Sequence, residues 1–245
     1  MIIGLCGAAR AGKDSIADAI EAHVGPDVGV RRIKISALLK SYIRELFDWT
    51  EEHTDGDLKD TPDERYPRPC WTCVVYDETD QGDGSPCPHC VDGTTYLTPR
   101  GAMQPLGGEF ADATYPPIYS VRAAREARAA VDGLLPCTTC GGKWPEVCSA
   151  CQGTGKMPPY AYALVTDVRF LRDAQAIKDV GGVLVMVERP DNESGLKGAA
   201  AAHQGEQARN SEEFQALVDI HILNNGTLDD LRDAVVATVF GKGLP

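Results

Sequence analysis

Short apolar runs typical of buried strands alternate along most of the chain with segments in which apolar residues recur at helical spacing. The first run covers residues 1–6, and Ile16 and Ile20 after it lie on one helical face. Repeated strand–helix units bury a parallel sheet between two layers of helices. The pattern therefore predicts an α/β fold with a mostly parallel five-stranded sheet and helices on both faces. The other predicted strands cover residues 30–36, 161–167, 183–187 and 218–223, and the other helices cover residues 39–47, 99–107, 117–133 and 170–180 and a segment capped by Thr227.

Three segments break this alternation. Residues 66–96 and 136–159 carry cysteine pairs among proline, glycine and polar residues, and they interrupt the pattern as insertions. Residues 190–213 are polar and rich in small residues, which is typical of a lid-like loop. We therefore expect a single domain over residues 1–245 that carries two insertions and one lid.

Composition narrows the class of protein. With 43% hydrophobic residues in 245, the chain can bury one substantial core. A net charge of -12 argues against a nucleic-acid partner, because such affinity comes mostly from lysine and arginine on phosphates, whereas a small anion can still bind locally. The sequence has neither an apolar run of about 18 residues nor the pattern of a signal peptide. We expect no membrane partner and a cytoplasmic location.

A glycine-rich segment, "GAARAGKDS", joins the first predicted strand to the first predicted helix. It fits G-x-x-x-x-G-K, in which the glycines let backbone amides curl around phosphate groups and the lysine reaches the outer phosphates. A glycine turn with an incidental lysine is the alternative, but the position between strand and helix favours a phosphate loop for ATP. Ser15 could contact Mg²⁺, although Asp14 stands where the commonest form of the motif has its serine. The predicted nucleotide-binding residues are Gly7, Ala8, Ala9, Arg10, Ala11, Gly12, Lys13, Asp14 and Ser15.

A carboxylate follows a second buried strand. Asp167 ends "AYALVTD", where a carboxylate can organise Mg²⁺ opposite a phosphate loop, and Arg169 follows two residues later. The alternative is an aspartate at a helix N-terminus next to an ordinary surface arginine. In the phosphate-loop interpretation, the expected catalytic residues are Lys13, Asp167, Arg169 and Arg189.

The order of motifs resembles the deoxynucleoside monophosphate kinases of tailed bacteriophages. "GAARAGKDS", "ISALLK", "TPRGAMQPLGGEF", "VTDVRF", "GGVLVMVERP" and "NNGTLDDL" follow one another as in that family, and the likeness covers most of the chain outside the cysteine insertions. The resemblance implies a P-loop kinase fold and transfer of the terminal phosphoryl group of ATP to a deoxynucleoside monophosphate. For a phage-encoded member, the compartment would be the host cytoplasm.

The resemblance also implies an acceptor site. Arg100 and Gln104 match the family's "TPR…Q…G" helix, and Ser36 and Lys40 lie in the segment that matches its acceptor-side helix. Arg169 matches the arginine of the family's D-x-R motif and would serve both substrates.

Two arginines are candidate site residues, and the chain departs from the family pattern at two positions. Arg189 and Arg209 are candidates for a lid that excludes water, with a solvated surface charge as the alternative for each. The chain lacks the arginine that often follows the Gly-x-Glu of the acceptor helix, and Asp173 stands where the family has glutamate.

Eight of the nine cysteines form four Cys-x-x-Cys pairs. In a reducing compartment this pattern favours metal ligation over disulfides, and two pairs supply the four thiolates of a tetrahedral zinc site. We therefore expect two structural zinc ions. The predicted ligands are Cys70, Cys73, Cys87 and Cys90 in the first insertion and Cys137, Cys140, Cys148 and Cys151 in the second.

Pairing of the cysteines within each insertion closes the shortest loops and is favoured, although the two insertions could share ligands. His89 is expected to be a bystander, and Cys6 a small buried apolar residue. Contact with a partner or nucleic acid is an alternative role for the insertions, which the acidic segment "DETDQGDG" disfavours.

Two further functions remain open from sequence. One keeps the phosphate loop but changes the acceptor, for example to dephospho-coenzyme A. The other is a zinc-stabilised interaction protein that binds nucleotide without turnover. The expected partners are small-molecule nucleotides, and a homodimer is one option for the assembly.

Overall fold

The computed structural model describes residues 1–8, 10–70, 94–143, 148–190 and 208–241. Its contacts divide the chain into two compact units: unit 1 comprises Met1–Ser36 and Pro116–Pro245, and unit 2 comprises Ala37–Tyr115.

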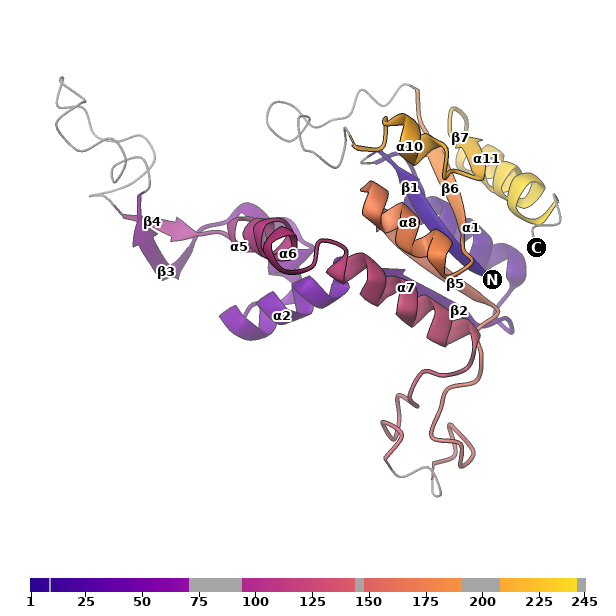
Figure 1. Ribbon diagram of the computed structural model, residues 1–245, viewed down its shortest axis with the longest axis horizontal. Coiled ribbons are helices and arrows are strands. Elements are labelled where there is room, and N and C mark those ends of the chain that lie inside the picture. Colours follow the sequence, from indigo (N-terminus) through magenta and orange to yellow (C-terminus); the bar gives the residue numbers. More distant parts are fainter. Residues whose placement is uncertain (9, 71–93, 144–147, 191–207, 242–245) are drawn as a thin grey trace. The chain divides into compact units, whose positions relative to one another are not determined.

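Unit 1 is built around one sheet of five strands, which are all parallel and lie in the order β2-β5-β1-β6-β7 (Figure 1). The prediction of an α/β fold with a five-stranded parallel sheet is confirmed. The elements of unit 1 are β1 (Ile2–Gly7), α1 (Lys13–Val24), β2 (Val30–Lys34), α7 (Ile118–Val131), β5 (Tyr162–Val168), α8 (Leu171–Asp179), β6 (Val183–Glu188), α10 (Glu212–Gln215), β7 (Ile220–Leu223), α11 (Leu228–Val235) and the π-helical turn η4 (Val236–Phe240).

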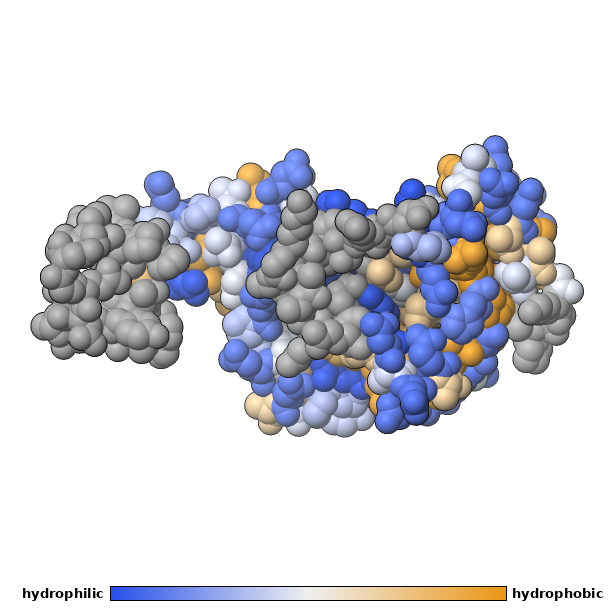
Figure 2. All heavy atoms as spheres, turned by 90° about the horizontal axis from the view of Figure 1, so that it is seen from above, coloured by the Kyte–Doolittle hydropathy of each residue, from blue (hydrophilic) through white to orange (hydrophobic). Residues whose placement is uncertain are grey.

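Helices cover both faces of the sheet. Ile3 and Leu5 of the central strand β1 are fully buried in one hydrophobic cluster with residues of α1 and α11. Ile2 and Cys6, which alternate with them, are buried in a second cluster with residues of α7 and α8. This is the alternation expected of a strand that is covered on both sides. Hydrophilic residues occupy much of the described surface seen in Figure 2, with hydrophobic residues between them.

The strand order places a crevice at the carboxyl ends of the strands. From β1 the chain runs to the edge strand β2, returns to β5 on one side of β1, and then crosses to β6 on the other side. Ligands of open α/β sheets bind where the order reverses in this way. The segment after β1 lies at that point.

Unit 2 has a small aromatic core of its own. The rings of Phe47 and Trp49 stack with centroids 4.6 Å apart, and Tyr66 meets both edge-on. The Tyr66 hydroxyl donates to the Phe47 carbonyl, at 2.6 Å. The elements of unit 2 are α2 (Ala37–Phe47), α3 (Glu51–Thr54), the 3₁₀ turn η1 (Asp57–Asp60), β3 (Asp63–Pro69), β4 (Thr94–Leu97), α5 (Pro99–Gly107) and α6 (Glu109–Thr114).

Several short elements of unit 2 are not predicted by the sequence pattern. Between residues 51 and 96 it predicts no regular structure, whereas the structure has α3, η1 and the antiparallel pair β3–β4 in the described part of that segment. These elements are four to seven residues long and mostly polar, so they carry no measurable periodicity. They are held by contacts such as the bond from Trp49 Nε1 to Asp63 Oδ2, at 2.6 Å.

The helices are short. The longest that the structure describes, α7, has 14 residues, whereas a membrane-spanning helix needs about 20 apolar residues. Among the described residues, no helix has both the length and the apolar character to cross a bilayer.

Burial in the central strands predicts where the stability of unit 1 resides. Leu164 of β5 is fully buried, whereas Leu223 of β7 is 51% exposed. We expect Leu164→Ala to lower the free energy of unfolding by about 2–5 kcal/mol, because it removes buried contacts and leaves a cavity. Leu223→Ala, the matched control, should change it by less than about 1 kcal/mol. Urea unfolding of the two variants measures both values, and equal losses would contradict this account of the core.

Candidate functional site

The segment between β1 and α1 requires glycine at two positions. Gly7 has φ 144°, and a Cβ there would lie 2.4 Å from the carbonyl oxygen of Val187. Gly12 has φ 110°, and a Cβ there would lie 2.6 Å from Nδ2 of Asn224. A side chain at either position would force the neighbouring strand or loop away. The sharp turn therefore depends on both glycines.

Lys13, the first residue of α1, folds back over this turn. Its Nζ donates to the carbonyl oxygens of Gly7 at 2.9 Å and Ala8 at 2.7 Å. Gly12 is the N-cap of α1 and has no side chain with which to cap the helix. The backbone amides of the first turn of α1, and with them the positive end of the helix dipole, therefore lie at the same turn as the Lys13 side chain.

A cavity of about 380 Å³ in unit 1 opens at this turn. Arg10, Lys13 and Arg189 bring three cationic side chains to its lining. Arg189 directly follows β6. Because β6 is parallel to β1, Arg189 lies at the same end of the sheet as the carboxyl end of β1. The remaining lining residues are Gly12, Asp14, Ser15, Asn224, Gly226, Thr227, Leu228 and Leu231.

Asn224 is a site residue that the sequence analysis missed. Its Nδ2 donates to the Ala11 carbonyl at 2.8 Å, and its backbone amide donates to the Glu188 carbonyl at 2.7 Å. The side chain is nearly buried and ties the end of β7 to the turn after β1. The sequence interpretation took "NNG" only as a turn. Its position directly after the last predicted strand was the available signal.

Asp167 and Ser36 lie together at the carboxyl end of β5. Oδ1 of Asp167 accepts from the Ile35 amide, and Oδ2 accepts from Ser36 Oγ, both at 2.8 Å. The backbone at Asp167 departs from regular strand geometry, with a bulge between β5 and β1 and a φ of 61°. Burial raises the pKa of the Asp167 carboxyl, against the opposing effect of the hydrogen bond from Ser36.

Asp173 fixes the backbone at Arg169. The amides of Arg169 and Phe170 donate to Asp173 Oδ2 at 3.0 and 2.9 Å, and Ser120 Oγ donates to Oδ1. Through these hydrogen bonds the buried Asp173 side chain joins the start of α8 to α7. An aspartate is therefore long enough to cap this helix.

Arg209, a lid candidate in the sequence analysis, is not the solvated surface charge that was the alternative. It is only 5% exposed, and its positive charge acts on the Cys6 thiol, which is itself fully buried. Burial raises the pKa of Cys6 to about 12, so the thiol stays protonated and donates to the Val185 carbonyl at 3.4 Å. The rest of the expected lid, apart from residues 190 and 208–213, lies outside the described residues, as does Ala9 of the glycine-rich segment.

The expected acceptor residues Lys40, Arg100 and Gln104 belong to unit 2. Lys40 pairs with Asp55, and Arg100 Nη2 lies 3.1 Å from Asp60 Oδ2. Gln104 is exposed one turn after Arg100 on α5. Thr98 caps that helix by accepting from the Gly101 amide, and Pro99 begins it, as the sequence predicts.

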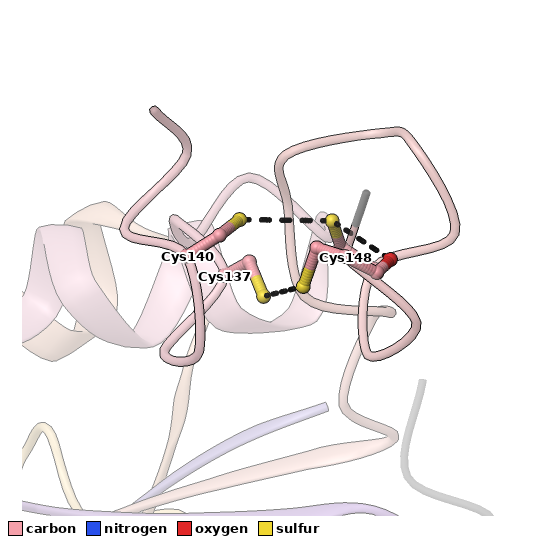
Figure 3. A group of neighbouring side chains, drawn as sticks. Cys137, Cys140 and Cys148 are labelled. Atoms are coloured by element: carbon pink, nitrogen blue, oxygen red, sulfur yellow. Dashed lines mark hydrogen bonds between the residues drawn. The ribbon is translucent and has the colours of Figure 1, made fainter. Parts of the chain in front are cut away.

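The second cysteine insertion brings four sulfurs together. The Sγ atoms of Cys137, Cys140, Cys148 and Cys151 all lie within 4.8 Å of one another. Two pairs are 3.7 and 3.8 Å apart, and Figure 3 shows the labelled side chains turned toward one another. Tetrahedral zinc about 2.3 Å from each sulfur would separate the sulfurs by about 3.8 Å. The cluster can hold a metal ion of this kind, and both pairs come from one insertion.

Backbone amides in the same insertion favour a thiolate. The Cys140 amide lowers the pKa of the Cys137 thiol to about 6, whereas burial raises that of Cys140 to about 11. Pro136 and Lys156 form a β-bridge that closes the base of the insertion.

Most of the first insertion lies outside the residues that the structure describes. Cys73, Cys87, Cys90 and His89 fall among residues that the structure does not describe. Cys70 is buried at the end of β3, where Pro69 pairs with Thr94. The second predicted zinc site therefore remains a prediction.

Comparison with protein-family models and with curated protein sequences finds no match for this chain.

Metal content tests the cysteine cluster directly. We expect Cys148→Ser to lower the zinc content of the purified protein by one equivalent per chain, because a closed site does not hold zinc tightly with three thiolates. Cys6→Ser, which removes the cysteine outside the pairs, should leave the zinc content unchanged. Elemental analysis measures both, and less than one zinc per chain in the parent protein would refute the site.

Proposed function

We propose that this protein is an ATP-dependent deoxynucleoside monophosphate kinase. The observation that carries the proposal is the cavity of about 380 Å³ at the N-terminal end of α1, with Lys13, Arg10 and Arg189 in its lining. Phosphoryl transfer depends on positioning the phosphates and cancelling their charge, and this cavity brings cations to the N-terminal end of a helix.

On the donor side, the residues after β1 hold the triphosphate. The Lys13 ammonium donates to the loop carbonyl oxygens of Gly7 and Ala8 and is thus placed to reach the outer phosphates. Asn224 holds the loop in its curled form through Ala11. Arg189 faces the same cavity and offsets charge on the transferred group.

The carboxylate of Asp167 would help to hold Mg²⁺, which would supply positive charge to offset that of the phosphates. Its bonds to Ile35 and Ser36 fix the orientation of the carboxylate. Ser15 lines the cavity and is the hydroxyl that would take a metal or phosphate contact.

Zinc has a structural role in this proposal. The second insertion supplies four thiolates and thus fills the tetrahedral shell of zinc without an open position for substrate. The metal would fold a segment that contributes few apolar residues to a core.

The acceptor assignment rests on the resemblance of the sequence to phage deoxynucleoside monophosphate kinases. Arg100 and Gln104 are four residues apart on α5 and so lie on one helical face. Both residues are exposed, so a ligand could reach them.

Turnover tests the reaction. We expect ADP release from ATP and Mg²⁺ in the presence of at least one of the four deoxynucleoside monophosphates, and a loss of at least about 100-fold in kcat for Lys13→Ala, because charge on the outer phosphates is no longer offset. Lys156→Ala, which removes an exposed lysine, is the control. Turnover only with another acceptor, such as dephospho-coenzyme A, would replace the substrate; nucleotide binding without turnover would favour the interaction protein.

Paired arginine variants test the acceptor side. We expect Arg100→Ala to raise KM for the deoxynucleoside monophosphate about tenfold or more, because a charge-assisted bond to phosphate is lost. Arg125→Ala removes an exposed arginine from α7 and should leave KM nearly unchanged. Steady-state kinetics at saturating ATP give both values. Equal effects would show that Arg100 does not hold the acceptor.

A further inference from the structure

The sulfurs of the second insertion contact one another across its two Cys-x-x-Cys turns. Cys137 and Cys140 belong to the first turn, and Cys148 and Cys151 belong to the second. The Sγ atoms of Cys137 and Cys148 are 3.7 Å apart, and those of Cys140 and Cys151 are 3.8 Å apart. Both contacts are marked by dashed lines in Figure 3. Each contact therefore joins one turn to the other.

The four cysteines differ in their exposure to solvent. Cys137, Cys148 and Cys151 are buried, with exposed fractions of 0%, 9% and 4%, whereas Cys140 is partly exposed. The two residues after Cys140 are exposed glycines, which have no side chain that could cover its sulfur. A small reagent that arrives from solvent therefore meets Cys140 first.

The base of the insertion is closed by backbone contacts that involve no sulfur. The Met157 amide donates to the Leu135 carbonyl at 2.8 Å, and the Cys137 amide donates to the Gly155 carbonyl at 2.9 Å. A β-bridge between the two chain segments lies at the same place. These contacts do not depend on a metal ion, so they keep the two Cys-x-x-Cys turns close together when the sulfurs react.

We propose that this cluster is a reversible oxidation site, at which a hydroperoxide converts the four thiolates into two disulfides, Cys140–Cys151 and Cys137–Cys148, and the metal ion is released. Each disulfide would replace one of the two contacts between the turns, so the insertion would stay cross-linked without metal. A dithiol would reduce both bonds and restore the ligands. This second function is independent of the proposed kinase function.

The oxidation begins at the partly exposed sulfur. The Cys140 thiolate attacks one oxygen of hydrogen peroxide, which breaks the O–O bond and gives a sulfenic acid and hydroxide. The Cys151 thiolate then attacks the sulfenic sulfur, forms the S–S bond and releases a second hydroxide. Two protons from solvent convert the hydroxides to water, so the two-electron oxidation of two thiolates balances the reduction of one peroxide. Loss of two of its four ligands releases the metal, and a second peroxide oxidises Cys137 and Cys148 in the same way.

The sequence allows the pairing of the disulfides to be measured directly. Trypsin cleaves after Lys143, between the two Cys-x-x-Cys pairs, and after Arg128 and Lys156 outside them. Each pair therefore falls in a peptide of its own, residues 129–143 and 144–156. The proposed disulfides join the two peptides into one species, which is lighter than the two reduced peptides together by four hydrogen atoms, two for each disulfide. Disulfides within each Cys-x-x-Cys pair would leave the peptides separate.

The experiment treats the full-length, zinc-loaded protein with increasing amounts of hydrogen peroxide and blocks the remaining thiols with iodoacetamide. A chromogenic chelator measures the released zinc, and mass spectrometry of the tryptic peptides assigns the disulfides. We expect at least one zinc ion to be released for each linked pair of peptides, and Cys140–Cys151 to be the first bond formed. Dithiothreitol and added zinc should reverse both changes. Cys6→Ser, the matched control, removes the buried cysteine outside the pairs and should leave both yields unchanged.

The other outcomes overturn the proposal. Peptides that stay separate after oxidation would show that the disulfides do not join the two turns. A first bond between Cys137 and Cys148 would contradict entry of the oxidant at Cys140. Retention of zinc and of free thiols, at a peroxide concentration that oxidises dithiothreitol in the same buffer, would show that the cluster is only structural. Because none of these readouts measures turnover, the kinase function stands or falls separately.

Discussion

The burial of β1 on both faces is the constraint on which the rest of unit 1 depends. Because this strand lies between β5 and β6 with helices above and below, it ends at the centre of the sheet rather than at an edge. The segment that follows has to turn sharply under the carbonyl of Val187, and only glycine at position 7 leaves room for that turn. The same parallel arrangement delivers Asp167, Arg189 and Asn224 to one side of the molecule, since each comes at or just after the carboxyl end of its strand.

Charge in this acidic chain is organised locally. Lys13 rests on two carbonyl oxygens, and Arg100 and Lys40 rest on single carboxylates. These contacts hold each cation in a defined place within its own unit.

The strong periodicities were sufficient to predict the sheet and most of its helices, because β1, β5 and β6 are mainly apolar runs and the helix starts at Pro99 and Thr227 are local signals. The contacts that the sequence did not reveal join distant positions. Asn224 reaches Ala11 across 213 residues, and Asp167 reaches Ser36 across 131 residues. The burial of Arg209 was not predictable, because Cys6, on which its charge acts, is remote in sequence. The cysteine cluster was predictable because thiolate spacing is itself a local signal.

The bridge between Pro136 and Lys156 gives the second insertion an independent character. The chain leaves α7 and returns toward β5 through two neighbouring residues, so the cysteine-bearing segment between them adds no separation to the elements that it connects. Closing a loop at its base makes its entropy nearly separable from that of the sheet. Such a segment can be lengthened, shortened or replaced without changing the geometry at the carboxyl ends of the strands, which lie at the opposite end of the sheet.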